Sequence, residues 1–291
     1  MSVDLRAWVG RTEVRDDVVT ASPLVRLAGV LDRSHDAASG DVPPLWHWLY
    51  FLDAPAQRDL GPDGHPARGG FLPPVTLPRR MYAGFRLHRR ADPRLGAPAR
   101  KTSTVADVAE KEGRTGPLVV VTVEHRVEAD GEELLVEEQD IVYTGASPAA
   151  VAGSRAETGG EAPSAPLEHD LRPDPTLLFR FSALTFNGHR IHYDHPYATS
   201  VEGYPGLVVH GPLIALLLGE LARSSRPGAA LAGLEFRSRR PVFEGEQVHL
   251  RGWPADGGER VELTAYREDG TVAAEAGASF DPGAAPDTAA G

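Results

Sequence analysis

The sequence predicts an α+β protein with two similar halves, each an antiparallel sheet wrapped around a central apolar helix. Each half begins with an apolar segment that suits a helix and continues into segments with strand-like alternation. In each half, the last two of these strands meet at an Asp-Gly pair, which is a strong signal for a β-hairpin. The repeated order of elements indicates a weak internal duplication.

In the first half, the apolar helix is expected over residues 44–52. A long polar stretch rich in proline and glycine follows it. Two strands are then expected on either side of the Asp130-Gly131 turn, at residues 118–128 and 134–143. The acidic run 132–138 is interpreted as a solvated strand face.

The second half is more regular. Its helix is expected over residues 211–224, where leucine and isoleucine surround most of the circumference, so the helix should be buried. An antiparallel sheet around one buried helix is the hot-dog arrangement, and two copies make a double hot dog. The strands of this half are expected at residues 232–239, 248–253, 261–267 and 272–280.

Composition divides the chain into four parts. Residues 146–166 are rich in alanine, glycine, serine, proline and glutamate without apolar periodicity, which is typical of a linker. We therefore expect an N-terminal domain over 1–145, a C-terminal domain over 167–282 and a disordered tail over 283–291.

Composition also excludes several functions. The net charge of −11 disfavours nucleic acid as a partner. The chain has no cysteine, which excludes a cysteine nucleophile, a thiolate metal site and disulfides. The longest apolar run, 207–218, is shorter than the roughly 20 residues that a membrane helix needs. With no signal-peptide core at the N-terminus, we expect a soluble, cytoplasmic protein.

The densest polar cluster lies between residues 181 and 199. Asp174 and Pro175 form a good helix start just before it, and this helix should break at Asn187-Gly188. The chain then presents several groups able to carry chemistry: Asn187, His189, Arg190, His192, Tyr193, Asp194 and His195. These histidines and the aspartate could also bind zinc, but a metal-free site explains them equally well, and no metal is expected.

A second cluster, residues 204–213, leads into the buried helix. The first backbone N–H groups of a helix are unpaired and carry partial positive charge. Gly211 has no side chain to block approach, so its N–H could polarise a ligand carbonyl. His210 beside it is a candidate substrate-binding residue, with a capping or structural role as the alternative.

Together the motifs FNGHRIHYDHPYA, at 186–198, and EGYPGLVVHGPL, at 202–213, resemble the MaoC-like hydratase/dehydratase superfamily. The resemblance is greatest to the branch with mesaconyl-CoA hydratase and the type 2 hydroxyacyl-thioester dehydratases. Segments in the first half are also similar to that branch: residues 44–52, 60–66, 70–84 and 111–125.

The resemblance implies a double hot dog whose sheets run together, with the substrate between the halves. The C-terminal copy would carry the catalytic loop and the N-terminal copy would help bind substrate. The superfamily pattern Gly-Asp-x-Asn-Pro-hydrophobic-His places its catalytic histidine at His192. Asn187 stands where the pattern has its aspartate, and Arg190 stands where it has proline.

The asparagine leaves two hypotheses open, because an amide cannot exchange protons at neutral pH. Either His192 shuttles the proton while Asn187 orients water, or Asp194 or a second histidine supplies the missing acid or base.

Arginines suggest how the substrate is held. Arg190 could hold the carboxylate of a dicarboxylic acyl group, or it could pair with Asp194. Asp194 is itself a candidate substrate-binding residue. Five further arginines are candidates for the phosphates of coenzyme A or a carrier protein, or else a solvated strand edge: Arg79, Arg80, Arg237, Arg239 and Arg240.

The expected function is a hydro-lyase that adds or removes water across an α,β-unsaturated acyl thioester of the mesaconyl- or itaconyl-CoA type. No cofactor is expected, and the assembly is a monomer or homodimer. One alternative is a (3R)-hydroxyacyl-[acyl-carrier-protein] dehydratase. Another, from a different class, is a non-catalytic thioester-binding protein or partner subunit.

Overall fold

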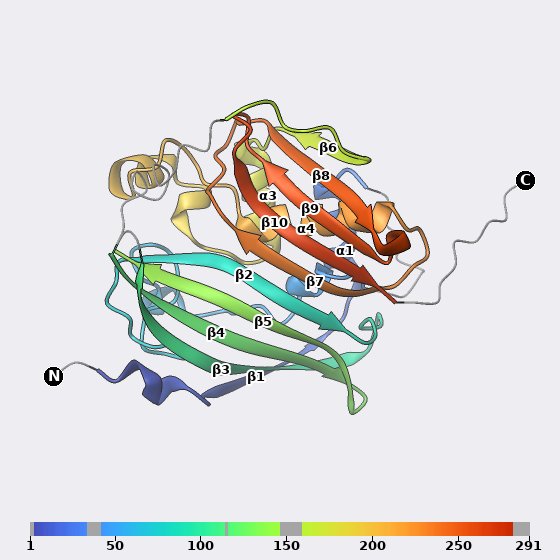
Figure 1. Cartoon of the computed structure of the whole chain (residues 1–291). Helices are drawn as coiled ribbons and strands as arrows, with labels where there is room; N and C mark the ends of the chain where they lie inside the picture. Colours follow the sequence, from blue (N-terminus) through green and yellow to red (C-terminus); the bar gives the residue numbers. More distant parts are fainter. Residues whose placement is uncertain (1–2, 34–41, 114–115, 146–158, 282–291) are drawn as a thin grey trace, which may run out of the picture.

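The computed structural model describes residues 3–33, 42–113, 116–145 and 159–281. These residues form one ten-stranded antiparallel sheet in the order β1-β3-β4-β5-β2-β7-β10-β9-β8-β6 (Figure 1). The strands are β1 Thr12–Val18, β2 Arg79–Arg89, β3 Pro98–Gly113, β4 Gly116–Ala129, β5 Glu132–Thr144, β6 Leu167–Leu171, β7 Leu231–Ser238, β8 Val248–Ala255, β9 Arg260–Tyr266 and β10 Val272–Phe280.

The predicted α+β class is confirmed, but the two sheets are one. Strand β2 of the first half pairs with β7 of the second, from Gly84 opposite Arg237 to His88 opposite Gly233. Gly84 allows this approach, because a Cβ atom there would lie 2.2 Å from the carbonyl oxygen of Phe236. The sheets therefore run together, as the family resemblance implied.

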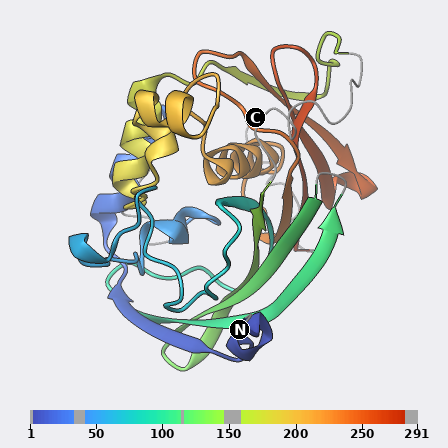
Figure 2. The same ribbon diagram turned by 90° about the vertical axis from the view of Figure 1, so that its left-hand side faces the viewer.

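The predicted central helix of the second half is confirmed as α4, Gly211–Ser224. Ten of its consecutive residues, 213–222, are buried, and it packs against strands from both halves, including β2, β8, β9 and β10. Figure 2 shows α4, in orange, enclosed on the concave side of the sheet. Removing this nearly all-round apolar surface from water favours the buried position.

The helix predicted at residues 44–52 is wrong. Only a 3₁₀ turn, η3 Trp46–Leu49, forms there, and residues in the left-handed region, Leu45 and Phe51, stand before and just after it. Its indole groups are anchored in different directions, since Trp46 donates to Glu220 of α4 and Trp48 donates to Glu137 of β5. These divergent anchors favour a single turn over a continuous helix.

The helix of the first half is instead α1, Ala21–Val30, which the sequence analysis did not predict. It packs against α3, Pro175–Leu184, of the second half. The described part of the first half therefore contains no long helix lying along its own strands. The loop between η3 and β2 occupies part of that space, and a cavity occupies another part.

The predicted strands lie within β4, β5 and β7 to β10, apart from end residues, whereas β1, β2, β3 and β6 were not predicted. The acidic run in β5 is not uniformly solvated, because Glu137 points inward and is only 4% exposed. Most of the predicted linker, residues 146–158, and the whole predicted tail, residues 283–291, lie outside the described residues.

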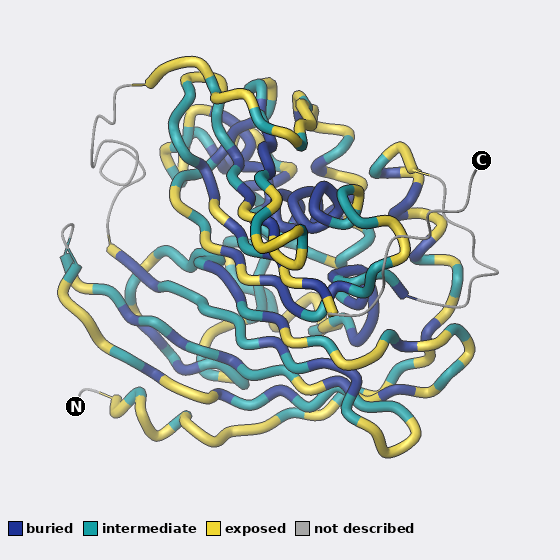
Figure 3. The backbone as a smooth tube through the Cα atoms, turned by 45° about the vertical axis from the view of Figure 1, so that its right-hand side comes forward, coloured by how far each residue is buried: buried dark blue, intermediate teal, exposed yellow. Residues whose placement is uncertain are grey.

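Buried residues concentrate in α4 and along the inner faces of the strands, whereas loops carry most of the exposed ones (Figure 3). A smaller apolar cluster fills the space under β3 and β4: Val75, Val105, Val108, Val119, Val121, Val123 and Tyr143. None of the helices in the described segments has the length and apolar character needed to cross a membrane.

The contact between the halves should be important for stability. Phe85 of β2 is 1% exposed and stacks on Phe236 of β7 with ring centroids 5.9 Å apart. We expect Phe85→Ala to lower the free energy of unfolding by about 3–5 kcal/mol, measured by urea denaturation. The exposed His88 on the same strand provides the control, and an equal loss in His88→Ala would contradict the role of the contact.

Candidate active site

A cavity of about 1530 Å³ opens between the two halves. The first half contributes the loop before β2 and the inner face of β2, including His65 and Tyr82. The second half contributes the loop after α3 and the start of α4, including His192 and Gly211. The two predicted polar clusters thus line the same space, facing residues of the other half.

His192 lies in this wall at the end of a 3₁₀ turn, η5 Arg190–His192, and is 7% exposed. Its Nδ1 lies 2.7 Å from the carbonyl oxygen of Val208. Because a carbonyl only accepts hydrogen bonds, Nδ1 carries the proton and Nε2 keeps a free lone pair. Burial, together with the charge of His65, lowers the pKa of His192 to about 4, so the imidazole is neutral near pH 7.

His210 does not line the cavity, which corrects its prediction as a substrate-binding residue. Its side chain is fully buried, with its ring stacked on His192 at 3.7 Å between centroids. Its Nε2 lies 2.8 Å from the hydroxyl of Ser182 on α3. His210 therefore packs against the ring of His192 without lining the cavity itself.

Asn187 lines the cavity at the end of α3. The predicted start of this helix is confirmed, since Asp174 caps it by accepting from the N–H of Leu177. The helix ends at Leu184, and Phe186, not Gly188, adopts a positive φ of 50°. The Asn187 side-chain oxygen accepts from the N–H of His189, so its NH₂ group remains for a ligand or water.

Gly211 begins α4 at the cavity wall, as predicted. Within the described segments, its N–H has no hydrogen-bond acceptor. A Cβ atom at this position would lie 3.1 Å from Tyr82 of β2, so the bare glycine leaves room for that ring. The buried hydroxyl of Tyr82 also has no partner among the residues described, and it lies on the same cavity.

Arg190 and Asp194, both predicted to bind substrate, bind each other. Arg190 donates from Nε and Nη2 to one carboxylate oxygen, at 3.0 and 2.8 Å, and from Nη1 to the carbonyl of Pro62. Its guanidinium also stacks over Tyr197. Asp194 does not line the cavity and accepts from the N–H of Tyr197. The pair stabilises the loop. This geometry favours pairing with Asp194, the second of the two roles considered for Arg190.

Arg237 and Arg240, the other predicted substrate-binding residues, both line the cavity. Arg237 is exposed on β7. Arg240 is partly buried and donates to the carbonyl of Val272. Both can therefore contact a ligand that occupies the cavity.

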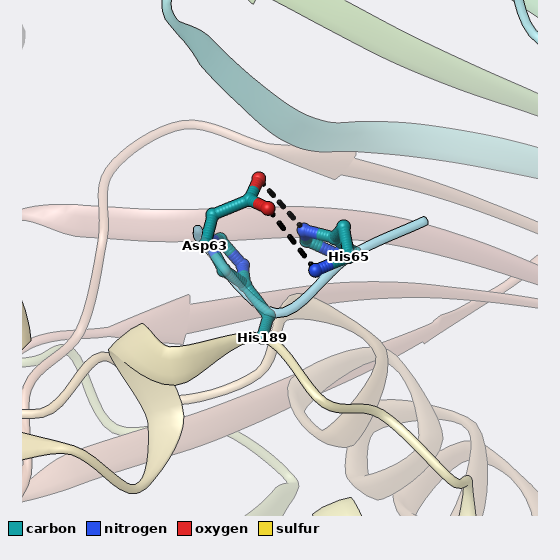
Figure 4. Close-up of side chains that lie close together, drawn as sticks. All are labelled: Asp63, His65 and His189. Atoms are coloured by element: carbon teal, nitrogen blue, oxygen red, sulfur yellow. Dashed lines mark hydrogen bonds and ion pairs between the residues drawn. The ribbon is translucent and has the colours of Figure 1, made fainter. Parts of the chain in front are cut away.

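The first half contributes an acidic and imidazole cluster that the sequence analysis did not assign. Figure 4 shows Asp63, His65 and His189 facing one another. Asp63 accepts from the backbone N–H of His65, and its other oxygen lies 3.3 Å from His65 Nδ1. The ring centroids of His65 and His189 are 4.1 Å apart, and those of His189 and His192 are 5.4 Å apart.

Electrostatics fixes the charge of this cluster. Burial opposes ionisation of Asp63, but its bonds with His65 outweigh burial and hold its pKa well below the usual range. Burial lowers the pKa of His65, and burial with the neighbouring histidines lowers the pKa of His189 to about 2. Asp63 is therefore the one ionised group of the three at neutral pH.

The loop that carries Asp63 packs against the loop that carries Gly188 and Arg190. Gly64 has a φ of +86°, and a Cβ atom there would lie 1.9 Å from the carbonyl oxygen of Gly188. The N–H of Arg190 donates to the carbonyl of Asp63. The Gly-Pro-Asp-Gly-His-Pro motif was visible in the sequence, but only the tertiary fold brings it to His192.

Asp63, His65 and His189 also offer ligand atoms within 4.8 Å of one another, the one such grouping in the described part of the chain. A cation would have to replace the Asp63–His65 hydrogen bonds. The existing bonds satisfy the carboxylate, so we interpret the cluster as hydrogen-bonded.

The low pKa of His192 can be measured directly by proton NMR. The imidazole Cε1 proton signal that disappears in His192→Gln should begin to titrate only below about pH 5, because burial disfavours the charged form. The exposed His195 provides an internal reference, with its signal assigned by His195→Gln. Titration of the His192 signal near the ordinary value for histidine would contradict this environment.

Comparison with known proteins identifies relatives along nearly the whole chain. The family model for hydroxyacyl-thioester dehydratase type 2 matches residues 45–244. Mesaconyl-C(4)-CoA hydratase of Chloroflexus aurantiacus is 45% identical over 289 residues, which cover 94% of this chain and 97% of that protein.

Solved structures agree on the fold. A MaoC-like dehydratase from Phytophthora capsici superposes with a TM-score of 0.72 at 15% identity and covers 98% of this chain and 100% of its own. A Mycobacterium tuberculosis protein with a double hotdog fold gives a TM-score of 0.55 at 13% identity, covering 94% and 96%. The predicted double hot dog and the predicted hydro-lyase activity are confirmed, and the chain belongs to the hydroxyacyl-thioester dehydratase type 2 family.

Proposed function

We propose that the protein hydrates a mesaconyl-type acyl-CoA, a short dicarboxylic thioester with an α,β double bond. The main support is one arrangement: a neutral His192 with a free Nε2 shares a cavity with the unpaired N–H of Gly211. Hydration needs these two groups, a base for water and a donor for the thioester oxygen. The 45% identity to mesaconyl-C(4)-CoA hydratase supports the substrate class.

In the proposed reaction, His192 Nε2 takes a proton from water as the water oxygen bonds to the β-carbon. Negative charge moves to the thioester oxygen, where the N–H of Gly211 and the positive end of α4 stabilise it. Protonated His192 then gives its proton to the α-carbon. One water molecule has been added, and His192 returns to its neutral form.

Neighbouring groups would hold water and the base in place. The Asn187 NH₂ group can donate to the attacking water, which fits the role expected for an amide in the position of the superfamily aspartate. His65 adds a second imidazole to the same wall, and Asp63, which does not line the cavity, holds an ionised carboxylate against that imidazole. The first half would thereby supply the carboxylate that the catalytic loop lacks.

The two halves would have different functions, one in catalysis and the other in substrate binding. The C-terminal domain, over 167–282, carries the catalytic loop and α4, whereas the N-terminal domain, over 1–145, supplies the opposite wall for substrate binding. We assign Arg237 and Arg240 to the phosphates of coenzyme A at the cavity mouth. The reaction moves only water and a proton, so the proposal includes no cofactor and no metal.

The test follows the loss of enoyl-thioester absorbance with mesaconyl-, itaconyl- and crotonyl-CoA. We expect the wild-type protein to hydrate mesaconyl-CoA fastest, and His192→Ala to lower kcat by about 10²–10⁴-fold, because general acid–base catalysis contributes this much. His195→Ala is the matched control, since His195 is exposed and does not line the cavity.

Other outcomes separate the alternatives. Full activity in a folded His192→Ala variant would reject its catalytic role. If the wild-type protein leaves all three coenzyme A thioesters unchanged but converts a carrier-protein thioester, the assignment to coenzyme A substrates is wrong. Tight binding of every thioester without turnover would indicate a binding protein.

A further inference from the structure

Among the residues that the structure describes, one partly buried cation in the cavity is not paired with a protein group. Of the nine arginines and lysines that line it, seven bind carboxylates or carbonyls: Arg15, Arg68, Arg79, Lys101, Arg190, Arg239 and Arg240. Arg237 is exposed. Arg80 is partly buried, and within the described segments it has no hydrogen bond or ion pair.

Arg80 lies beside the reactive centre. It is two residues before Tyr82 on β2, so both side chains project from the same face of the strand, about 7 Å apart along it. Tyr82 in turn lies against Gly211, where the thioester carbonyl would bind. After burial, the positive charge of Arg80 is among the causes that lower the pKa of His65 and His189, which is consistent with this position.

An unpaired guanidinium that is partly buried in the cavity wall favours an anionic ligand, and its planar donors match a carboxylate or a phosphate. We propose that Arg80 binds the free carboxylate of the acyl group and so selects dicarboxylic over simple enoyl thioesters. This inference rests on the proposed hydratase function. It gives Arg80 the role that the sequence suggested for Arg190. The donor groups of Arg190 are already bound to the Asp194 carboxylate and the Pro62 carbonyl.

Position favours the acyl carboxylate over the phosphates. In a mesaconyl group, the free carboxylate is only a few bonds from the thioester carbonyl. A carbonyl held at Gly211 therefore keeps the carboxylate near the wall that Tyr82 and Arg80 form. The phosphates of coenzyme A are separated from the same carbonyl by the long pantetheine arm, which places them towards the cavity mouth.

The experiment compares Arg80→Gln with wild type on three substrates: mesaconyl-CoA, crotonyl-CoA and mesaconyl-pantetheine. Loss of charged hydrogen bonds should lower kcat/KM by about 100-fold for both mesaconyl thioesters. For crotonyl-CoA, which lacks the carboxylate, the change should stay within about threefold. Arg80→Lys should restore part of the activity, because it keeps the charge without the planar fork.

Two matched variants complete the test. Arg90→Gln removes an exposed charge of the same sign just after β2 and should leave all three activities unchanged. Arg190→Ala should lower mesaconyl- and crotonyl-CoA turnover to the same extent, because it loosens the catalytic loop without changing selectivity.

Three results would overturn the assignment. Equal losses for both coenzyme A substrates, with mesaconyl-pantetheine unaffected, would mean that Arg80 binds phosphate. Equal losses for all three would mean a structural role, and no loss with any would mean no contact. Failure of the hydratase proposal itself is separate, since the wild-type protein would then convert neither mesaconyl- nor crotonyl-CoA.

Discussion

The pairing of β2 with β7 is the constraint on which the rest of the molecule depends. It fuses two sheets into one and fixes the inner face of the first half against the start of α4 in the second. The approach needs a glycine, because Gly84 lies against the carbonyl of Phe236. Once the strands are paired, Tyr82 meets Gly211 and the substrate cavity has walls from both halves.

The second constraint is electrostatic. Four imidazoles, those of His65, His189, His192 and His210, form a contiguous row, and burial lowers the pKa of each. Neutral imidazoles suit the proposed role of His192, a base that must accept one proton and release it within the same turnover. The carboxylate of Asp63, at one end, supplies the negative charge that can favour this brief protonation.

Local signals made half of the fold predictable. Asp174 caps α3 as expected, because a cap depends on neighbours three residues away, and the periodicity of α4 was equally explicit. Pairings between distant residues were not visible. The anchors of η3 on Glu137 and Glu220, and the meeting of Asp63 with the catalytic loop, exist only in the folded chain. For Arg190 the sequence offered two roles, and only the geometry of Asp194 distinguishes them.

The absence of a helix like α4 among the described residues of the first half has a consequence for substrate range. In the proposed reaction the N-terminus of α4 stabilises the thioester oxygen, so the interior of the second half is under chemical constraint. The described part of the first half lines its share of the cavity with strand residues and a loop. Substitutions on its strands, away from Asp63 and His65, can reshape the acyl pocket without disturbing the proton-transfer step. Such a division lets one ancestral chemistry diversify among substrates through changes in only one copy of the repeat.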